Sequence, residues 1–332
     1  MSRSVAIVMY HYVRPVHASR YPGIAGLEAR AFQEQVAYIQ RHFNVISGFE
    51  LERAILEGTE VPENAAVLTF DDGYLDHFTT VLPVLDAAGF TGSFFPPVNC
   101  ITKRRVLDVN KLHYILASAP SPSAVVQQLD TEVEVRRAET GLNQLETYRR
   151  EFAKPGRYDA AEVAYVKNML QHGLPQPVRG EIVDVLFDAF VGVPEEALAN
   201  ELYMTVEQLK LLVRAGMHVG SHGATHRWMN RIPPEEQEKE IDRSLEFLEH
   251  LGVDLENGWT MCYPYGGHNA SLRGLLHNRN CTVGHTIRVD IARLDRDGPL
   301  ELPRLDTNDL PKDAQASVSP WLSAMRAVPY AK

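Results

Sequence analysis

Two pairs of polar residues in this sequence have the types and spacing that metal chemistry requires. Asp71 and Asp72 stand directly behind the apolar run AAVLTF (65–70), and His222 and His226 follow another short apolar stretch. Two imidazoles four positions apart on one turn can bind a single metal ion, and a carboxylate can complete the site. The alternatives are an accidental H-x-x-x-H among thirteen histidines and an Asx-type turn at the two acids.

The two adjacent acids favour different tasks. Neighbouring side chains in extended backbone point to opposite sides, although the local twist at a strand end can bring both near one centre. One acid can then bind a metal while the other stays free as a base. They are poorly placed to flank a sugar as glycosidase carboxylates do, because those lie about 5 Å or more apart.

The segments that must position these residues alternate in type. Short apolar runs predict buried strands, at 5–10, 65–70, 91–95, 217–220, 259–263 and 281–287, with a short extended piece at 300–304. Helical spacing and capping signals predict helices, at 29–42, 48–57, 76–88, 205–215, 233–251, 270–278 and 317–326. This alternation is typical of a parallel sheet or a (β/α) barrel.

The alternation is interrupted by a long segment in which we find helical patterns only. We interpret 103–203 as a helical insertion, and 1–102 with 204–332 as one (β/α) barrel. The insertion could form a substrate wall or a homo-oligomer contact, or it could be a surface elaboration with no catalytic part.

The predicted strands end in polar residues. His11, the Asp71-Asp72 pair, His222 and the Tyr263-Pro264-Tyr265 segment each follow a different strand. In a parallel barrel the carboxyl ends of the strands share one face, and that face carries the active site. We therefore expect these residues to meet in one site.

Three motifs resemble those of a known family. TFDDG (69–73), SHGATH (221–226) and YPYG (263–266) resemble the first three motifs of the polysaccharide deacetylases, the NodB-homology or carbohydrate esterase family 4 enzymes. The resemblance covers roughly 1–100 and 204–305. It implies a deformed (β/α) barrel with, in this chain, a large helical insertion.

The resemblance also implies a divalent metal, usually zinc. Carried over position by position, Asp72, His222 and His226 are the ligands and Asp71 is the base. Such a metal acts as a Lewis acid and lowers the pKa of its water. The resemblance further implies that the backbone N–H of Tyr265 stabilises the oxyanion.

The sequence departs from the family pattern at the general acid. Most members have a late L-x-x-x-x-H motif, but no histidine follows His285 here. Relatives similar to the poly-N-acetylglucosamine deacetylases are circularly permuted, with this motif at the N-terminus. His11, in MYHYV, fits that arrangement. The alternative for His11 is a hydrogen-bonded core histidine.

Other departures concern the groups around the ligands. Cys262 stands where the third motif usually has arginine, and Gly223 replaces a hydroxyl residue. Arg304 and Asp306, in LPRLD, are candidates for an arginine–carboxylate pair that orients Asp71.

The tryptophans near these motifs have two interpretations. Trp228 and Trp259 are candidates for stacking against a sugar, and core packing is favoured for Trp259.

The composition of the chain disfavours some classes of binding partner. The net charge of −10, the pI of about 5.7 and the lack of a Lys/Arg block disfavour nucleic acid and anionic membranes. The three cysteines match no zinc spacing, so we expect reduced, buried thiols. The apolar stretch at 5–10 is too short for a signal peptide or a membrane span, which favours the cytoplasm.

The leading functional hypothesis is metal-dependent hydrolysis of an N-acyl, most simply N-acetyl, group on an amino sugar. A cytoplasmic enzyme would act on a nucleotide-linked or lipid-linked precursor of a surface polysaccharide, O-antigen or lipopolysaccharide. One alternative is a deformylase or another small N-acyl amide hydrolase. A second is an inactive sugar-binding or scaffold protein, which Cys262 and the missing late histidine favour and an intact Asp71 disfavours.

Overall fold

The computed structural model describes residues 2–156, 159–176 and 178–326. They form two compact units, which we call the barrel unit (Met1–Pro15, Gly26–Arg105 and Ala199–Lys332) and the helical unit (Val16–Ala25 and Val106–Leu198). Residues 16–25, which the sequence pattern assigned to the barrel, belong to the helical unit. The ring of Tyr21 packs edge-on against that of Tyr114 there, with the centroids 4.7 Å apart.

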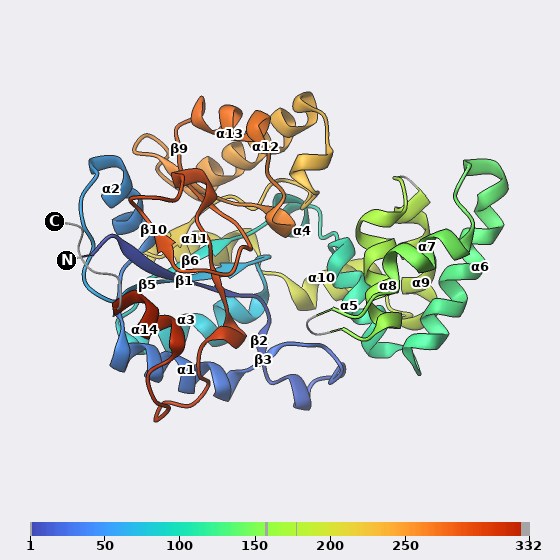
Figure 1. Ribbon diagram of the computed structural model, residues 1–332, viewed down its shortest axis with the longest axis horizontal. Helices are drawn as coiled ribbons and strands as arrows, with labels where there is room; N and C mark the ends of the chain where they lie inside the picture. Colours follow the sequence, from blue (N-terminus) through green and yellow to red (C-terminus); the bar gives the residue numbers. More distant parts are fainter. Residues whose placement is uncertain (1, 157–158, 177, 327–332) are drawn as a thin grey trace. The chain divides into compact units, whose positions relative to one another are not determined.

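The barrel unit alternates strands and helices along the chain (Figure 1). Its strands are β1 (Ser4–Tyr10), β2 (Val13–Arg14), β3 (Leu27–Glu28), β4 (Asn44–Val45), β5 (Ala65–Asp71), β6 (Gly92–Phe95), β7 (His218–Val219), β8 (Trp259–Cys262), β9 (Cys281–His285), β10 (Ala292–Arg293) and β11 (Leu305–Asp306). Its α-helices are α1 (Ala29–His42), α2 (Gly48–Glu57), α3 (Leu82–Ala88), α4 (Val98–Thr102), α11 (Val206–Arg214), α12 (Pro234–Leu251), α13 (Ala270–His277) and α14 (Pro320–Arg326).

The strands close into a ring of parallel neighbours. β1 pairs with β5, β5 with β6, and β6 with β7. A parallel bridge between Ser221 and Met261 continues to β8, which pairs with β9. A second bridge, His285 to Leu302, leads to β11, which returns to β1. This is the deformed barrel that the motifs implied, with β10 added antiparallel to β1.

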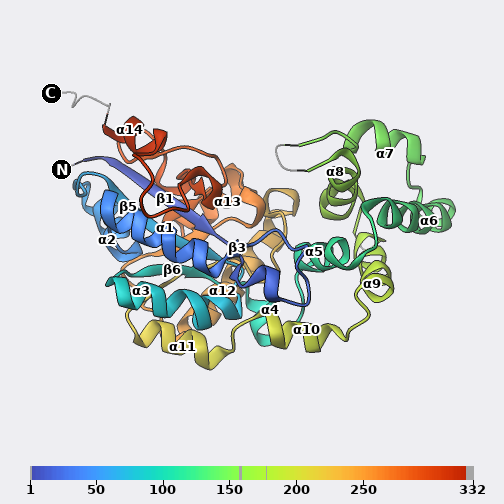
Figure 2. The same ribbon diagram turned by 90° about the horizontal axis from the view of Figure 1, so that it is seen from below.

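Two apolar layers hold the strands in place. Inside the ring, Val5, Val67 and Val283 belong to one buried cluster that also contains Leu51 of α2. Outside it, an aromatic layer joins the strands to α1: Tyr10 stacks on Phe70 at 5.0 Å, and both rings meet Phe32. Figure 2 shows α1 and α3 against this outer side of β5 and β6. A strand buried on both faces must be apolar throughout, which explains the continuous runs in the sequence.

The register of β1 and β5 sets the level of the strand ends. The pairs run from Val5 opposite Ala65 to Tyr10 opposite Phe70. The next residues of the two strands, His11 and Asp71, are therefore neighbours at the carboxyl end of the barrel. Asp71 itself lies opposite Phe95 of β6.

The remaining predicted elements agree closely with those in the structure, with two differences. The helix predicted at 76–88 begins as a π-helix, His77–Val81, before α3. The extended piece predicted at 300–304 is divided between a 3-10 helix (Pro299–Glu301), the Leu302 bridge and β11.

The helical unit contains helices and no strand among its described residues, as predicted. They are a 3-10 helix (Val16–Ala18), α5 (Asp108–Ser118), α6 (Pro122–Thr140), α7 (Leu145–Phe152), α8 (Ala161–Asn168), a π-helix (Met169–Gly173) and α9 (Val178–Phe190). The next helix, α10 (Glu195–Leu202), begins in this unit and ends in the barrel unit. Among the described residues, no helix is both long enough and apolar enough to cross a membrane.

Closure of the ring beside β9 predicts a strict need for glycine at position 284. A Cβ there would lie 2.5 Å from the Leu300 carbonyl oxygen and 2.7 Å from the Tyr263 hydroxyl. Because backbone must then move, we expect Gly284→Ala to lower the free energy of unfolding by about 1–3 kcal/mol. Urea unfolding followed by circular dichroism measures this.

Gly274→Ala is the matched control for Gly284→Ala. Gly274 lies in α13, where a Cβ would meet nothing within 4 Å, and alanine favours a helix over glycine by about 0.5–1 kcal/mol. Equal unfolding curves for the two variants would contradict the close packing at β9.

Candidate metal centre

Asp71 ends β5 inside the barrel, where an arginine grips it. Arg304 donates from Nη1 to Oδ1 of Asp71 at 2.9 Å and from Nη2 to Oδ2 at 2.8 Å. The same guanidinium donates to Thr69 Oγ1 at 3.1 Å and, through Nε, to the Thr286 carbonyl at 2.9 Å. Asp71 and Arg304 are each 1% exposed, so the pair is desolvated and its two-pronged geometry is fixed.

The charge of Asp71 follows from this contact. Burial raises the pKa of its carboxyl, but the charge and the two hydrogen bonds of the Arg304 guanidinium oppose this, and the pKa lies well below the usual range. Asp71 is therefore a carboxylate over the whole neutral range, as a general base must be.

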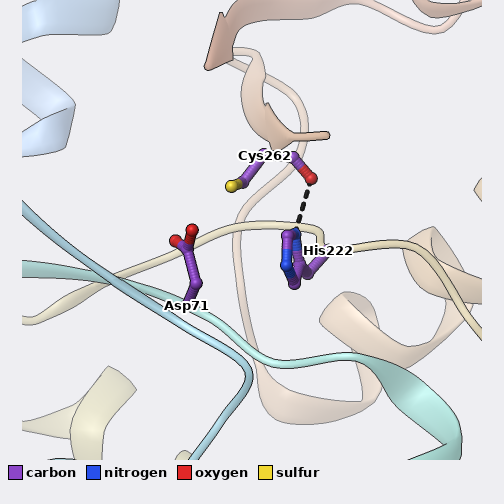
Figure 3. A group of neighbouring side chains, drawn as sticks. All are labelled: Asp71, His222 and Cys262. Atoms are coloured by element: carbon purple, nitrogen blue, oxygen red, sulfur yellow. Dashed lines mark hydrogen bonds between the residues drawn. The ribbon is translucent and has the colours of Figure 1, made fainter. Parts of the chain in front are cut away.

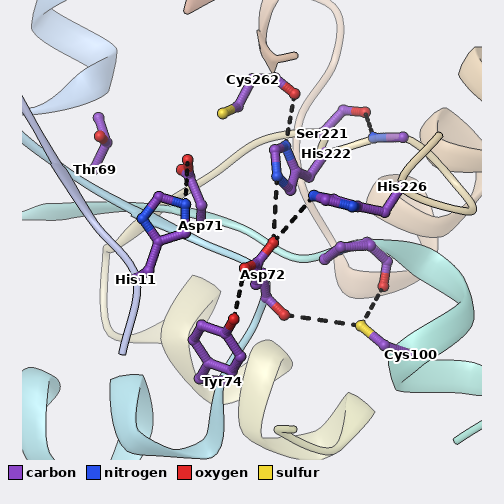
Figure 4. A network of polar contacts seen from close by, with 12 residues as sticks. His11, Thr69, Asp71, Asp72, Tyr74, Cys100, Ser221, His222, His226 and Cys262 are labelled. Carbon is purple, nitrogen blue, oxygen red and sulfur yellow. Dashed lines mark hydrogen bonds and ion pairs between the residues drawn. The ribbon is translucent and has the colours of Figure 1, made fainter. Parts of the chain in front are cut away.

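Asp72 points to a different centre because the backbone turns at this residue. Its φ of 73° is left-handed, which aspartate tolerates better than most residues. Its Oδ2 accepts a hydrogen bond from the Tyr74 hydroxyl at 2.7 Å. Its Oδ1 is buried without a hydrogen-bond partner and faces His222 and His226 (Figure 4).

The two histidines lie in the loop that follows β7. Gly223 and His226 both have positive φ, 71° and 57°, which folds the loop back so that both rings face Asp72. Glu240 of α12 holds this loop: it accepts from the backbone N–H groups of Ala224 and Thr225 at 2.9 and 2.8 Å. Gly223 lacks the hydroxyl group that the family has at this position, and the buried carboxylate of Glu240 supports the loop instead.

The donor atoms fit a tetrahedral metal. The Nε2 atoms of His222 and His226 lie 3.5 and 3.3 Å from Oδ1 of Asp72. Metal–ligand bonds of about 2.0–2.1 Å separate tetrahedral ligands by about 3.4 Å. His222 donates from Nδ1 to the Cys262 carbonyl at 2.7 Å, which leaves Nε2 with its lone pair. The orphaned Oδ1 and two imidazole nitrogens are the donor set that zinc prefers.

His11 and Asp71 face the same space, as the register of β1 and β5 requires. The His11 Nε2 lies 3.9 Å from Oδ2 of Asp71, and the His11 side chain is 43% exposed (Figure 4). His11 is therefore not the buried core histidine of the alternative interpretation. It lies at the mouth of the barrel beside Asp71, with a partly exposed side chain.

Tyr265 lies beside His226. Its φ is 56°, and its ring meets the edge of His226 at 4.7 Å and stacks on Trp228 at 4.7 Å. The Arg231 guanidinium lies over the Trp228 ring at 4.8 Å. Trp228 therefore braces Tyr265, and its ring already has two stacking partners. Trp259 is 2% exposed and donates to the Arg279 carbonyl at 2.7 Å, which is core packing.

The site does not include every predicted residue. Asp306 caps a short 3-10 helix, where its Oδ1 accepts from the backbone N–H and the side-chain amide of Asn308 at 2.8 and 2.6 Å. This capping role engages the Asp306 carboxylate. Arg304 therefore binds Asp71 without help from Asp306.

The three cysteines are free and buried, as expected. Cys262, Asp71 and His222 lie close enough to suggest a second cation site (Figure 3). The Arg304 guanidinium already bonds both oxygens of Asp71, so a cation is held there by the protein itself.

Three residues around the site were missed by sequence reasoning. They are Tyr74, which bonds Asp72; Glu240, which holds the histidine loop; and His77, which bonds the backbone of His11. Tyr74 adjoins the TFDDG motif and could have been suspected. Glu240 is one of several acids on an amphipathic helix, and no local signal distinguishes it.

Known proteins resemble part of this chain in sequence. A polysaccharide deacetylase family model matches residues 193–284, which include the SHGATH and YPYG motifs but not TFDDG. The poly-beta-1,6-N-acetyl-D-glucosamine N-deacetylases of Escherichia coli K12 and O157:H7 are each 40% identical over 58 residues, or 17% of this chain. The match covers only 9% of the length of those relatives.

Solved structures share the fold over nearly the whole chain. The Streptococcus pyogenes deacetylase PplD, in complex with acetate, has a TM-score of 0.57 at 16% identity and matches over 98% of this chain and 99% of its own. IcaB from Ammonifex degensii has a TM-score of 0.52 at 17% identity, over 97% of this chain and 96% of its own. The circular permutation suggested by His11 stays a prediction. The family match over 193–284 and the shared fold confirm that this chain resembles the polysaccharide deacetylases, with their deformed (β/α) barrel.

Proposed function

We propose that the protein is a metal-dependent hydrolase that removes the acyl group, most simply acetyl, from the nitrogen of an amino sugar. The observation that carries the proposal is the unpartnered Oδ1 of Asp72 facing two imidazole nitrogens, beside a second carboxylate that Arg304 keeps off those ligands. A metal ion with a purely structural role needs only Asp72 and the two histidines. A hydrolase also needs a base, and the ionised Asp71, held apart by Arg304, can be that base.

In this proposal each polar group has one task. Asp72, His222 and His226 would hold a zinc or similar ion, which would act as a Lewis acid toward the acyl carbonyl and the attacking water. Asp71 accepts the proton of the attacking water. The backbone N–H of Tyr265 stabilises the negative charge on the acyl oxygen.

His11 completes the proton transfers. Its ring lies beside Asp71 and is partly open, so it can donate a proton to the departing amine. Asp71 and His11 then share one proton route, from water to leaving group. The inactive-binder alternative assigns no task to this base and acid pair.

The substrate follows from the family and from the proposed location. A carbohydrate suits a deacetylase of this family, and the names of the Escherichia coli relatives specify an N-acetylglucosamine polymer for those proteins. If the protein is cytoplasmic, as the sequence analysis predicts, we propose a nucleotide-linked or lipid-linked precursor of a surface polysaccharide or O-antigen. A formyl amide is the alternative, and acetate and formate assays separate the two.

Metal content tests the ligand set. We expect the purified protein to carry about one divalent ion per chain and His222→Ala to lose it, because two ligands rarely retain zinc. Plasma emission spectrometry gives the ratio. His250→Ala, at an exposed position of α12, is the control and should keep the ion. An unchanged metal content in His222→Ala would contradict the proposed ligand set.

Substituting the base tests the reaction. Asp71→Asn keeps the shape and the Arg304 neighbour but cannot accept a proton, so turnover should fall by about 10²–10⁴-fold while metal content stays. Acetate release is measured with N-acetylglucosamine oligomers and with nucleotide-linked N-acetyl sugars. An Asp71→Asn protein as active as the wild type would show that another group is the base.

The grip of Arg304 on Asp71 predicts the pH dependence. The wild-type pKa of Asp71 is depressed, so the base stays ionised as pH falls. Removing the guanidinium leaves burial as the dominant influence, so the pKa of Asp71 rises. The acid limb of the kcat/KM profile should therefore move to higher pH in Arg304→Met.

Arg304→Lys, which keeps the positive charge, is the companion variant and should show a smaller shift of the acid limb. Arg304→Met should also unfold more easily, by about 3–5 kcal/mol, because it leaves a buried carboxylate unpaired. An acid limb in Arg304→Met identical to that of the wild type would mean that Arg304 does not set the charge of Asp71.

A further inference from the structure

His77 is a buried histidine with no task in the mechanism above. It is 0% exposed, and its Nε2 lies 2.8 Å from the backbone carbonyl oxygen of His11. A carbonyl oxygen only accepts, so His77 carries its proton on Nε2 and donates it to His11. Burial lowers the pKa of His77 to about 4, so the ring is neutral and the tautomer is the donating one at neutral pH.

Aromatic rings leave the His77 side chain little freedom. Its ring centroid lies 5.4 Å from that of Tyr74, 5.5 Å from Phe70 and 6.0 Å from Phe94. His77 also opens the π-helix His77–Val81, a rare geometry that occurs often at functional sites. The donor is thus held rigidly just behind the Asp71-Asp72 turn.

The contact belongs to a set that ties the tip of β1 to the segment after β5. Tyr12 stacks on Tyr74 with centroids 4.3 Å apart and planes 19° apart. Arg14 donates from Nε to Oδ2 of Asp76 at 2.6 Å. We call these two segments, residues 11–14 and 74–77, the clasp.

The clasp bears on the position of His11 relative to Asp71, the two residues of the proposed proton route. His11 has left β1 and has a half-open side chain, so strand pairing no longer fixes it. Asp71 is fixed by Arg304. The His77 contact holds the backbone of His11 itself, and the other two contacts hold the residues that follow.

We propose that His77, at the centre of the clasp, is a positioning residue that sets the distance from His11 to Asp71 and so makes His11 an effective acid. The inference rests on the proposed function for the role of His11. His77 itself touches neither the ligands nor the reacting atoms in this assignment.

The test compares two leaving groups. Departure of an amine needs a proton from His11, whereas 4-nitrophenolate, released from 4-nitrophenyl acetate, departs without one. His77→Met fills the space but cannot donate, and we expect amide turnover to fall by about 10²-fold, as small misplacements of catalytic groups do. Ester turnover and metal content should stay at the wild-type level.

Rescue separates positioning from packing. His77→Gln places an amide N–H near the former Nε2 and should recover most of the amide turnover. Thr79→Ala, at an exposed position of the same π-helix, is the control and should match the wild type. Equal losses of amide and ester turnover in His77→Met, or no rescue by glutamine, would overturn the proposal.

A crystal structure of His77→Met gives a readout that needs no turnover. The separation of His11 Nε2 from Asp71 Oδ2, 3.9 Å here, should widen or become variable. An unmoved His11 refutes the positioning role. If wild-type protein hydrolyses no N-acyl sugar, the proposed function fails, while this distance still decides the role of His77.

A second variant covers the case in which His77→Met does not fold. Asp76→Asn weakens the clasp at a side chain that is 17% exposed. We expect a smaller loss in the same sense, with amide turnover falling more than ester turnover. An unchanged ratio of the two rates in Asp76→Asn would count against the clasp.

Discussion

The parallel pairing of β1 with β5 is the constraint on which the rest of the site depends. Six consecutive residue pairs fix this register, from Val5 opposite Ala65 to Tyr10 opposite Phe70. Side chains alternate along a strand, so a slip of one residue would turn His11 away from Asp71 and move the aromatic layer into the barrel. The cores inside and outside the ring both oppose such a slip. Apolar packing thereby places His11 and Asp71 on the same side of the barrel.

The second constraint is the buried charge of Asp71. Desolvation of a carboxylate is costly unless a partner with matching geometry is present, and the Arg304 fork supplies one. In the family pattern an arginine stands where this chain has Cys262. Here the guanidinium comes from the segment before β11 instead, and a small thiol at 262 leaves it space beside Asp71. The missing arginine at position 262 had favoured an inactive protein. Arg304 supplies the same positive charge to Asp71 from the segment before β11.

Much of this could be predicted from sequence, for a physical reason. Continuous apolar runs mark strands buried on both faces, and polar residues at their ends mark the carboxyl face of a barrel. That logic placed Asp71 and His11 at neighbouring strand ends, because the register of β1 and β5 sets the level at which both strands end. It failed at Asp306, whose carboxylate caps a short helix and does not orient Asp71. It also could not give the positive φ values at Asp72 and His226 that aim these two side chains. Glu240 and His77 were missed because each contacts residues that are far from it in the sequence, and no sequence pattern links the partners.

Backbone strain concentrates where the donors converge. Among the described residues six non-glycine positions have positive φ, and three of them are Asp72, His226 and Tyr265. Each costs about 1–2 kcal/mol relative to ordinary backbone. Hydrogen bonds from Tyr74 and to Glu240 offset part of this, but they leave Oδ1 of Asp72 without a partner. A bound ion satisfies that oxygen and both imidazoles at once, so its binding free energy would add directly to the stability of the strained turn. Folding and metal binding would then be coupled through the turn at Asp72, which directly follows β5 and belongs to the proposed ligand set.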